Sequence, residues 1–205
     1  MKIKLYNIPF LFLFLFLVSC SSIDEGAIVG TWEINPDKCE LSIDNKIFDF
    51  LPQEIADQYG YTSLLLPMMF KSAMKQLAMK IEFKEDGTWE RLDEARLDEK
   101  ISELFEFKWS IDNERLILLC PEPNLNEQID QINHQFKSNA FDNLLVEIVF
   151  DINKLSDSKL SITLDLYAFL LLYHERGYID QFNIKKEDFK SIAKNIKLTL
   201  AFKKV

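Results

Sequence analysis

The sequence predicts a mainly β protein with inserted helices (α+β), an antiparallel meander that closes into a barrel of about eight to nine strands. Three observations lead to this prediction. Several segments alternate apolar and polar residues with the period of two that marks half-buried strands. Short turn sequences join many of these segments, so successive strands are expected to pair antiparallel. Closing such a meander into a barrel removes its exposed edges.

The first strand is expected near Ile28–Asn35, and a hairpin is expected around Asp86-Gly87, a dipeptide that favours tight turns. Two further hairpin connections are expected at Ile111–Glu114 and Lys154–Lys159. The remaining predicted strands share an apolar face. They are Ile81–Lys84, Trp89–Leu92, Phe105–Ile111, Val146–Ile152, Leu160–Leu166 and Ile196–Lys203.

Helical patterns interrupt the meander. Each has an apolar stripe or a recognisable start or stop signal, such as a proline in the first turn or a glycine just past the end. Leu166–Arg176 is apolar nearly all round, which fits either a buried helix or a continued strand. The predicted helices are Pro52–Tyr59, Pro67–Lys80, Asn124–Phe136, Leu166–Arg176 and Lys185–Asn195.

Four of the five methionines lie in or beside one predicted helix: Met68, Met69, Met74 and Met79. Thioether side chains repack easily, so this helix could form an adaptable lid over an apolar cavity. The alternative is an ordinary helix whose methionines pack as core.

The N-terminus carries the features of a secretory signal. Lys2 and Lys4 supply positive charge before Ile8–Val18, an unbroken apolar run of 11 residues. As a helix this run rises only about 16 Å, about half of the ~30 Å hydrocarbon core of a bilayer. A cleaved signal is therefore favoured over a membrane-spanning helix.

The run ends in Leu17-Val18-Ser19-Cys20, which resembles the lipobox of bacterial lipoproteins. The resemblance implies cleavage before Cys20 and acylation of this cysteine, whose acyl chains would hold the protein on a membrane. It divides the chain into a signal peptide (1–19), a lipidated tether (20–27) and a domain (28–205). Ser21, directly after the cysteine, resembles the residue found there in lipoproteins that are sorted to the outer membrane. The resemblance therefore implies an outer-membrane lipoprotein of the cell envelope, on the periplasmic or the surface face of that membrane. The alternative is an ordinary secretory signal with a chance cysteine.

With Cys20 lipidated, Cys39 and Cys120 are the remaining cysteines. One disulfide is then conceivable in an oxidising compartment. The alternative is two buried thiols.

Gly30-Thr31-Trp32, at the start of the first strand, resembles the Gly-x-Trp motif of lipocalins. The resemblance implies a lipocalin-like barrel in which Trp32 plugs the closed end. In that family an arginine of the last strand covers the tryptophan, and this chain offers Lys203 or Lys204 instead. The helix that follows the barrel in secreted lipocalins is also missing.

No pattern in the sequence indicates catalysis, a metal site or a cofactor. The two histidines, His134 and His174, belong to no metal-binding cluster, and no nucleophile elbow or phosphate-binding glycine loop is present. The acids between residues 82 and 106 alternate with lysines and arginines, as on a solvated surface. A net charge of −9 disfavours nucleic-acid binding.

The leading interpretation is a lipid-anchored protein whose barrel binds a small apolar or amphipathic molecule. The alternative is a protein-interaction or inhibitory envelope lipoprotein with a filled barrel, since eight-stranded barrels can do either. The residues expected to line the ligand cavity face inward in the alternation. They are Phe83, Trp89, Phe107, Trp109, Phe150 and Leu164.

The anchor yields a first prediction. The Cys20→Ser variant should no longer be acylated or cleaved by the lipoprotein route, because a hydroxyl does not replace the thiol as the lipid acceptor. Metabolic labelling with a fatty-acid analogue, followed by gel analysis, measures this. Label retained by the variant would contradict the assignment.

Overall fold

The computed structural model describes residues 23–50, 53, 65–92, 106–121 and 145–205. The predicted signal peptide, Cys20, and the predicted helices Pro52–Tyr59 and Asn124–Phe136 lie wholly or largely outside these residues. Among the described residues, no helix is long and apolar enough to cross a membrane.

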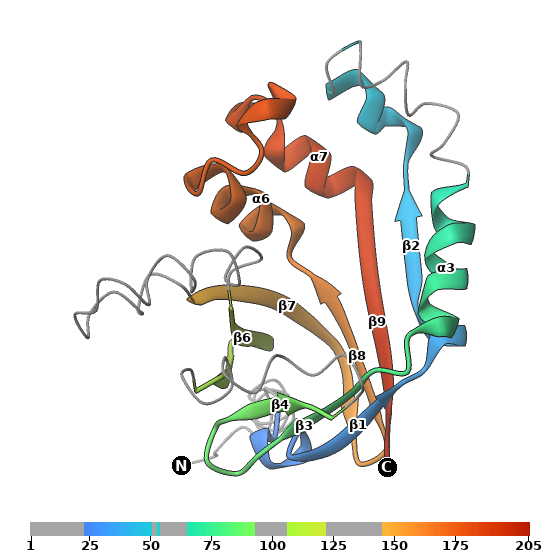
Figure 1. Cartoon of the computed structure of the whole chain (residues 1–205), viewed down its shortest axis with the longest axis vertical. Coiled ribbons are helices and arrows are strands. Elements are labelled where there is room, and N and C mark those ends of the chain that lie inside the picture. Colours follow the sequence, from blue (N-terminus) through green and yellow to red (C-terminus); the bar gives the residue numbers. More distant parts are fainter. Residues whose placement is uncertain (1–22, 51–52, 54–64, 93–105, 122–144) are drawn as a thin grey trace, which may run out of the picture.

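The core of the structure is a nearly closed antiparallel barrel with inserted helices, which confirms the predicted fold class (Figure 1). The sheet order is β4-β3-β1-β9-β8-β7-β6-β5, so barrel neighbours follow one another along the chain, and β9 returns to β1. The eight strands are β1 (Gly30–Ile34), β3 (Lys80–Phe83), β4 (Trp89–Arg91), β5 (Trp109–Asp112), β6 (Arg115–Pro121), β7 (Leu145–Ser156), β8 (Lys159–Leu164) and β9 (Ile196–Lys204).

The two edge strands of the sheet, β4 and β5, approach each other near their first residues. Thr88 and Lys108 form an isolated antiparallel bridge. The Trp89 N–H donates to the Phe107 carbonyl at 2.9 Å, and the Trp109 N–H donates to the Gly87 carbonyl at 2.7 Å. These bonds join β4 to the start of β5 and bring the sheet close to full closure.

A ninth strand, β2 (Glu40–Ile43), continues the edge of β9 that β1 begins. Between β1 and β2 the chain leaves the sheet in a short 3₁₀ turn that starts at Pro36, a residue without an N–H to give to a ladder. β1 and β2 thus form one interrupted strand along β9.

In the described part of the chain, three α-helices are inserted between the strands. They are α3 (Leu66–Gln76), α6 (Leu166–Glu175) and α7 (Phe189–Asn195). The segment Leu166–Arg176, for which the sequence allowed either a helix or a strand, forms the helix α6. Asp165 caps this helix by accepting the Ala168 N–H at 3.0 Å. α3 ends four residues before the predicted Lys80, because Lys80 belongs to β3. The 3₁₀ turns are Glu25–Ala27, Pro36–Lys38, Asn45–Phe50, Asp180–Phe182 and Lys186–Asp188.

The connections divide the barrel into an open and a closed end. In an antiparallel meander, alternate connections lie at the same end. The connections 84–88, 113–114 and 157–158 are short turns at one end, which we call the closed end. The described strand ends that flank residues 35–79, 92–108, 122–144 and 165–195 lie at the other end, which we call the open end. The helices α3, α6 and α7 lie on these long connections (Figure 1).

Trp32 is the centre of the core at the closed end. Its side chain is fully buried, and its Nε1–H donates to the Ile28 carbonyl at 2.6 Å. The Lys204 ammonium of β9 lies 5.2 Å from the centroid of the Trp32 ring, within cation–π range. Lys204 therefore occupies the place over the tryptophan that the sequence left open between Lys203 and Lys204, while Lys203 pairs with Glu33 at 2.8 Å.

Gly30 makes this arrangement possible. Its φ is +123°, a value that L side chains rarely adopt, and a Cβ there would lie 2.7 Å from Cε of Lys204. The glycine of the Gly-x-Trp motif therefore leaves room for the lysine that covers the tryptophan.

Truncating the core tryptophan should destabilise the fold strongly. We expect Trp32→Ala to lower the free energy of unfolding by about 3–5 kcal/mol, because a fully buried aromatic leaves a large cavity. Trp109→Ala should cost less, since Trp109 is only partly buried. Denaturant unfolding followed by circular dichroism compares the two. Equal losses, or a near-neutral Trp32→Ala, would contradict the role of Trp32.

Adding one methyl group at Gly30 should also be costly. We expect Gly30→Ala to lose roughly 1–3 kcal/mol through backbone strain, in addition to displacing Lys204. Gly26→Ala is the matched control: Gly26 is exposed, and its added Cβ would meet only the Asp24 side chain. Thermal unfolding of both variants tests this, and similar losses at the two glycines would refute it.

Candidate functional site

The closed half of the barrel is filled by aromatic side chains. Of the residues predicted to line a cavity, Phe83, Trp89, Phe107 and Phe150 are buried. The Trp89 and Phe107 rings have centroids 5.8 Å apart, and the Trp89 Nε1–H donates to the Leu119 carbonyl at 3.2 Å. Such contacts hold aromatic rings in place. These four side chains form a packed floor below the open half.

The other two predicted lining residues lie at opposite ends of the barrel. Trp109 stacks edge-on against Phe83 with ring centroids 5.8 Å apart and donates its Nε1–H to the Lys84 carbonyl at 3.1 Å, at the closed end. Leu164 is the last residue of β8, at the open end, and is partly exposed. The structure thus does not gather the predicted set around one cavity.

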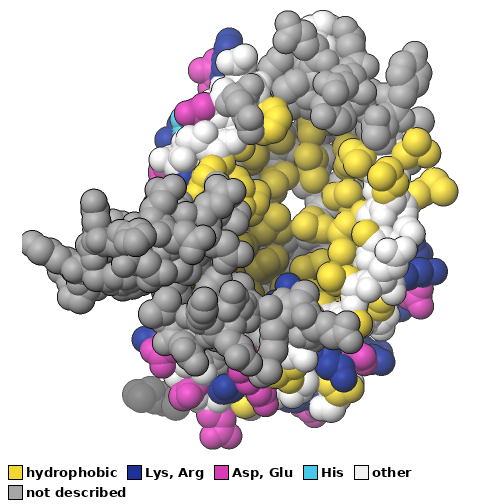
Figure 2. All heavy atoms as spheres, in the orientation of Figure 1, with side chains coloured by type: hydrophobic (Ala, Val, Ile, Leu, Met, Phe, Trp, Pro, Cys, Tyr) yellow, Lys and Arg dark blue, Asp and Glu magenta, His cyan; other side chains and the backbone are white. Residues whose placement is uncertain are grey.

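An apolar hollow opens at the other half of the barrel. In Figure 2 hydrophobic side chains line a depression between the side that carries α3 and β2 and the side that carries α6 and α7. At this end, several partly buried apolar residues pack against the core. They are Phe70, Met74 and Leu77 of the α3 segment and Leu145, Ile148, Leu164 and Leu200 of the strands.

The rim of the hollow on α3 is also apolar. Leu65, Met68 and Met69 are 53%, 70% and 60% exposed, while Met74 and Met79 pack against the core. The methionines of this segment therefore fit both interpretations in part. Met74 and Met79 pack as core, whereas Met68 and Met69 remain at the surface, where an adaptable lid would have them. Exposed methionines beside an apolar hollow are suited to adaptable contacts.

Arg91 is an interior residue that sequence reasoning missed. It lies opposite Ile81 in the β3–β4 ladder, and its Nε atom is buried. The signal was present, because Arg91 follows Trp89 by two residues and so shares its inward face.

The two remaining cysteines are both free thiols in the structure, so the disulfide considered from the sequence is not formed there. Cys39 is buried, and its sulfur accepts the Ala201 N–H at 3.4 Å. Burial raises the pKa of both thiols, that of Cys120 to about 12. Both thiols are therefore protonated near neutral pH.

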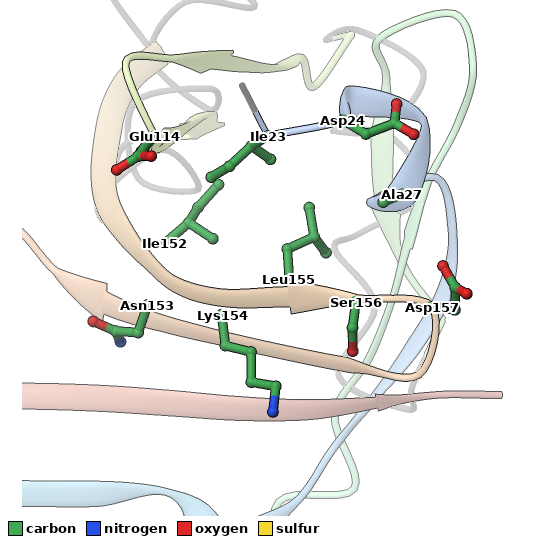
Figure 3. Close-up of a pocket in the computed structure, with 10 residues that line it drawn as sticks. All are labelled: Ile23, Asp24, Ala27, Glu114, Ile152, Asn153, Lys154, Leu155, Ser156 and Asp157. Atoms are coloured by element: carbon green, nitrogen blue, oxygen red, sulfur yellow. The ribbon is translucent and has the colours of Figure 1, made fainter. Parts of the chain in front are cut away.

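A second hollow lies at the closed end, outside the aromatic floor. Figure 3 shows the side chains of Ile23, Ile152 and Leu155 converging in a cleft of about 480 Å³ between the N-terminal segment and β7. β7 is irregular there, since its register with β8 shifts between Ile152 and Lys154. The contact places Ile23 against the closed end of the barrel.

Within the described part of the chain, no three His, Cys, Asp or Glu side chains converge on a common point where a metal could bind. His174 contacts Asp180 at 3.2 Å on the surface beside α6. Comparison with known proteins finds no matching family model, no matching curated protein and no matching solved structure.

The partly buried Cys120 thiol should make stability depend on alkaline pH. Its pKa rises from an ordinary value of 9.0 to about 12 in the fold. Between these values the unfolded chain releases a proton that the folded chain keeps, so stability falls as pH rises. We expect the free energy of unfolding to drop more steeply than in Cys120→Ala, by about 1.4 kcal/mol per pH unit.

Urea unfolding of both proteins between pH 8 and 11, with a reductant present, measures the two slopes. The Cys120→Ala variant controls for lysine and tyrosine titration, which both proteins share. Parallel slopes would contradict burial of this thiol.

Proposed function

We propose that this protein is a lipid-anchored envelope protein with a lipocalin-like barrel, which binds a small apolar or amphipathic molecule in its open half. The observation that supports this most directly is the apolar hollow at the open end, closed below by a packed aromatic floor. Mostly apolar concave sites of this kind are the usual place for small ligands.

The closed end supports the lipocalin-like assignment. Trp32 follows a strained glycine, closes the barrel and is covered by a cation of the last strand. The cation is Lys204 where lipocalins have arginine. The meander order is the one that the resemblance implies.

The geometry of the N-terminus bears on the proposed anchor. Ile23, the first described residue, lines the cleft at the closed end, and the proposed anchor, Cys20, precedes it by three residues in the sequence. A barrel held there by acyl chains would turn its open end away from the membrane. The ligand would then exchange with the aqueous space or with a facing partner.

The apolar hollow offers enough area for useful affinity. At about 25 cal/mol per Å², burying about 300 Å² of ligand surface contributes about 7 kcal/mol before ordering costs. Binding at micromolar concentrations corresponds to about 8 kcal/mol net, so it also requires the wall of the hollow to bury a similar apolar area against the ligand. Simple sugars would gain little, because the hollow is lined by apolar side chains.

The exposed residues of α3 favour a second candidate function, docking of a partner protein. Leu65, Met68 and Met69 form an apolar rim that a partner could cover. This candidate predicts that rim substitutions abolish function while binding of small apolar probes is absent.

Ligand binding can be tested with the neutral probe Nile red. We expect micromolar binding, measured by its fluorescence, and loss of that binding in Leu164→Trp, which would fill the hollow. Ser161→Trp is the matched control, because Ser161 lies on the same strand but faces outward, opposite Ala201. Absence of probe binding to the unaltered protein would overturn the proposal and favour partner docking.

A further inference from the structure

We propose that Arg91 binds the anionic head of an acyl amphipath, which enters the barrel head first and leaves its tail in the apolar hollow. This inference rests on the proposed function and adds to it a ligand class and an orientation. The head would be a carboxylate or a phosphate, the groups that a guanidinium fork fits best.

The register of three strands places Arg91 on the inner face of the barrel. Trp32 of β1 lies opposite Ile81 of β3, and Ile81 lies opposite Arg91 of β4. Residues directly opposite in a ladder project from the same face of the sheet. Since Trp32 and Ile81 are buried in the core, Arg91 projects inward with them.

Arg91 also lies at the right depth. β4 runs from the closed end at Trp89 toward the open end, so Arg91 is two residues above the aromatic floor. Two residues of a strand rise about 6.6 Å. The backbone of Arg91 is therefore farther from the closed-end turn than that of Trp89, on the side toward the apolar hollow.

The charges on the inner face favour an anion. On that face of the described strands the charged side chains are Arg91 and Lys204, and no Asp or Glu is placed there by the registers. The Cys120 thiol on the same face is neutral, because its pKa is raised to about 12. Lys204 covers Trp32 at the closed end. A guanidinium carries five N–H donors, so it can serve contacts within the chain and a ligand anion together.

The apolar surface above Arg91 fits the tail. Ile148, Leu164 and Leu200 line the strands at this end, and the α3 segment adds Phe70 and Met74. The exposed Met68 and Met69 extend the apolar surface to the rim. Figure 2 shows this surface as continuous from the hollow to the edge of the molecule, with Lys or Arg atoms at the edge of the hollow.

The experiment compares ligands that share a tail and differ in the head. The natively processed protein is placed in lipid nanodiscs, with empty nanodiscs as the blank, and dodecanoate, dodecyl phosphate and dodecanol compete with Nile red. We expect at least one of the two anions to bind roughly ten- to hundred-fold more tightly than dodecanol. Which anion binds better identifies the head as carboxylate or phosphate.

Variants then assign the preference to one side chain. In Arg91→Gln, the affinities for the anion and for dodecanol should differ by no more than about threefold, while Nile red still binds. Arg91→Lys should keep part of the preference for the anion. Lys197→Gln is the control, because Lys197 is an exposed lysine on the outer face of β9. It should leave the preference unchanged.

Two results would overturn the inference without touching the proposed function. One is Nile red binding to the unaltered protein with dodecanol competing as well as both anions, a result that needs no variant to fold. The other is an anion preference that survives in Arg91→Gln. Failure of Nile red itself to bind would instead reject the proposed function.

Discussion

The structure depends on how the barrel is sealed around Trp32. The ring is fully buried, its N–H is satisfied by the Ile28 carbonyl, and the ammonium of Lys204 lies over its face. The contact between Lys204 and Trp32 links the first and last strands of the barrel. These strands are neighbours in the sheet but lie at opposite ends of the chain. Gly30 permits it, because any side chain there would collide with Lys204.

Sealing one end leaves the other end available for function. The tight turns at the closed end tolerate little insertion, whereas the described strand ends that flank the long connections lie at the open end. The helices on these connections place apolar side chains around the open half without filling it (Figure 2). A packed closed half below an apolar hollow is the arrangement that the proposed binding of a small molecule requires.

The proposed ligand follows from the same division. Among the described residues, aromatic rings fill the floor, Arg91 is the arginine that faces inward above it, and apolar residues continue to the rim. A purely apolar site would accept any oily molecule, whereas an interior cation would select molecules with an anionic head. The whole chain has a net charge of −9, which makes an inward cation the more distinctive feature.

The fold class could be predicted from the sequence, because strand periodicity, hairpin turns and helix signals are local and agree with one another. Gly30 and Trp32 were likewise identifiable from a short motif. The tertiary packing was needed to show which inward residues fill the barrel and which surround a hollow, since Phe83 and Leu164 alternate alike but lie at different depths. It also decided that Lys204, not Lys203, covers Trp32, and that Arg91 faces inward. The depth of a side chain in the barrel and the residue that faces it depend on the register between strands that are far apart in the chain. The periodicity along one strand carries no information about that register.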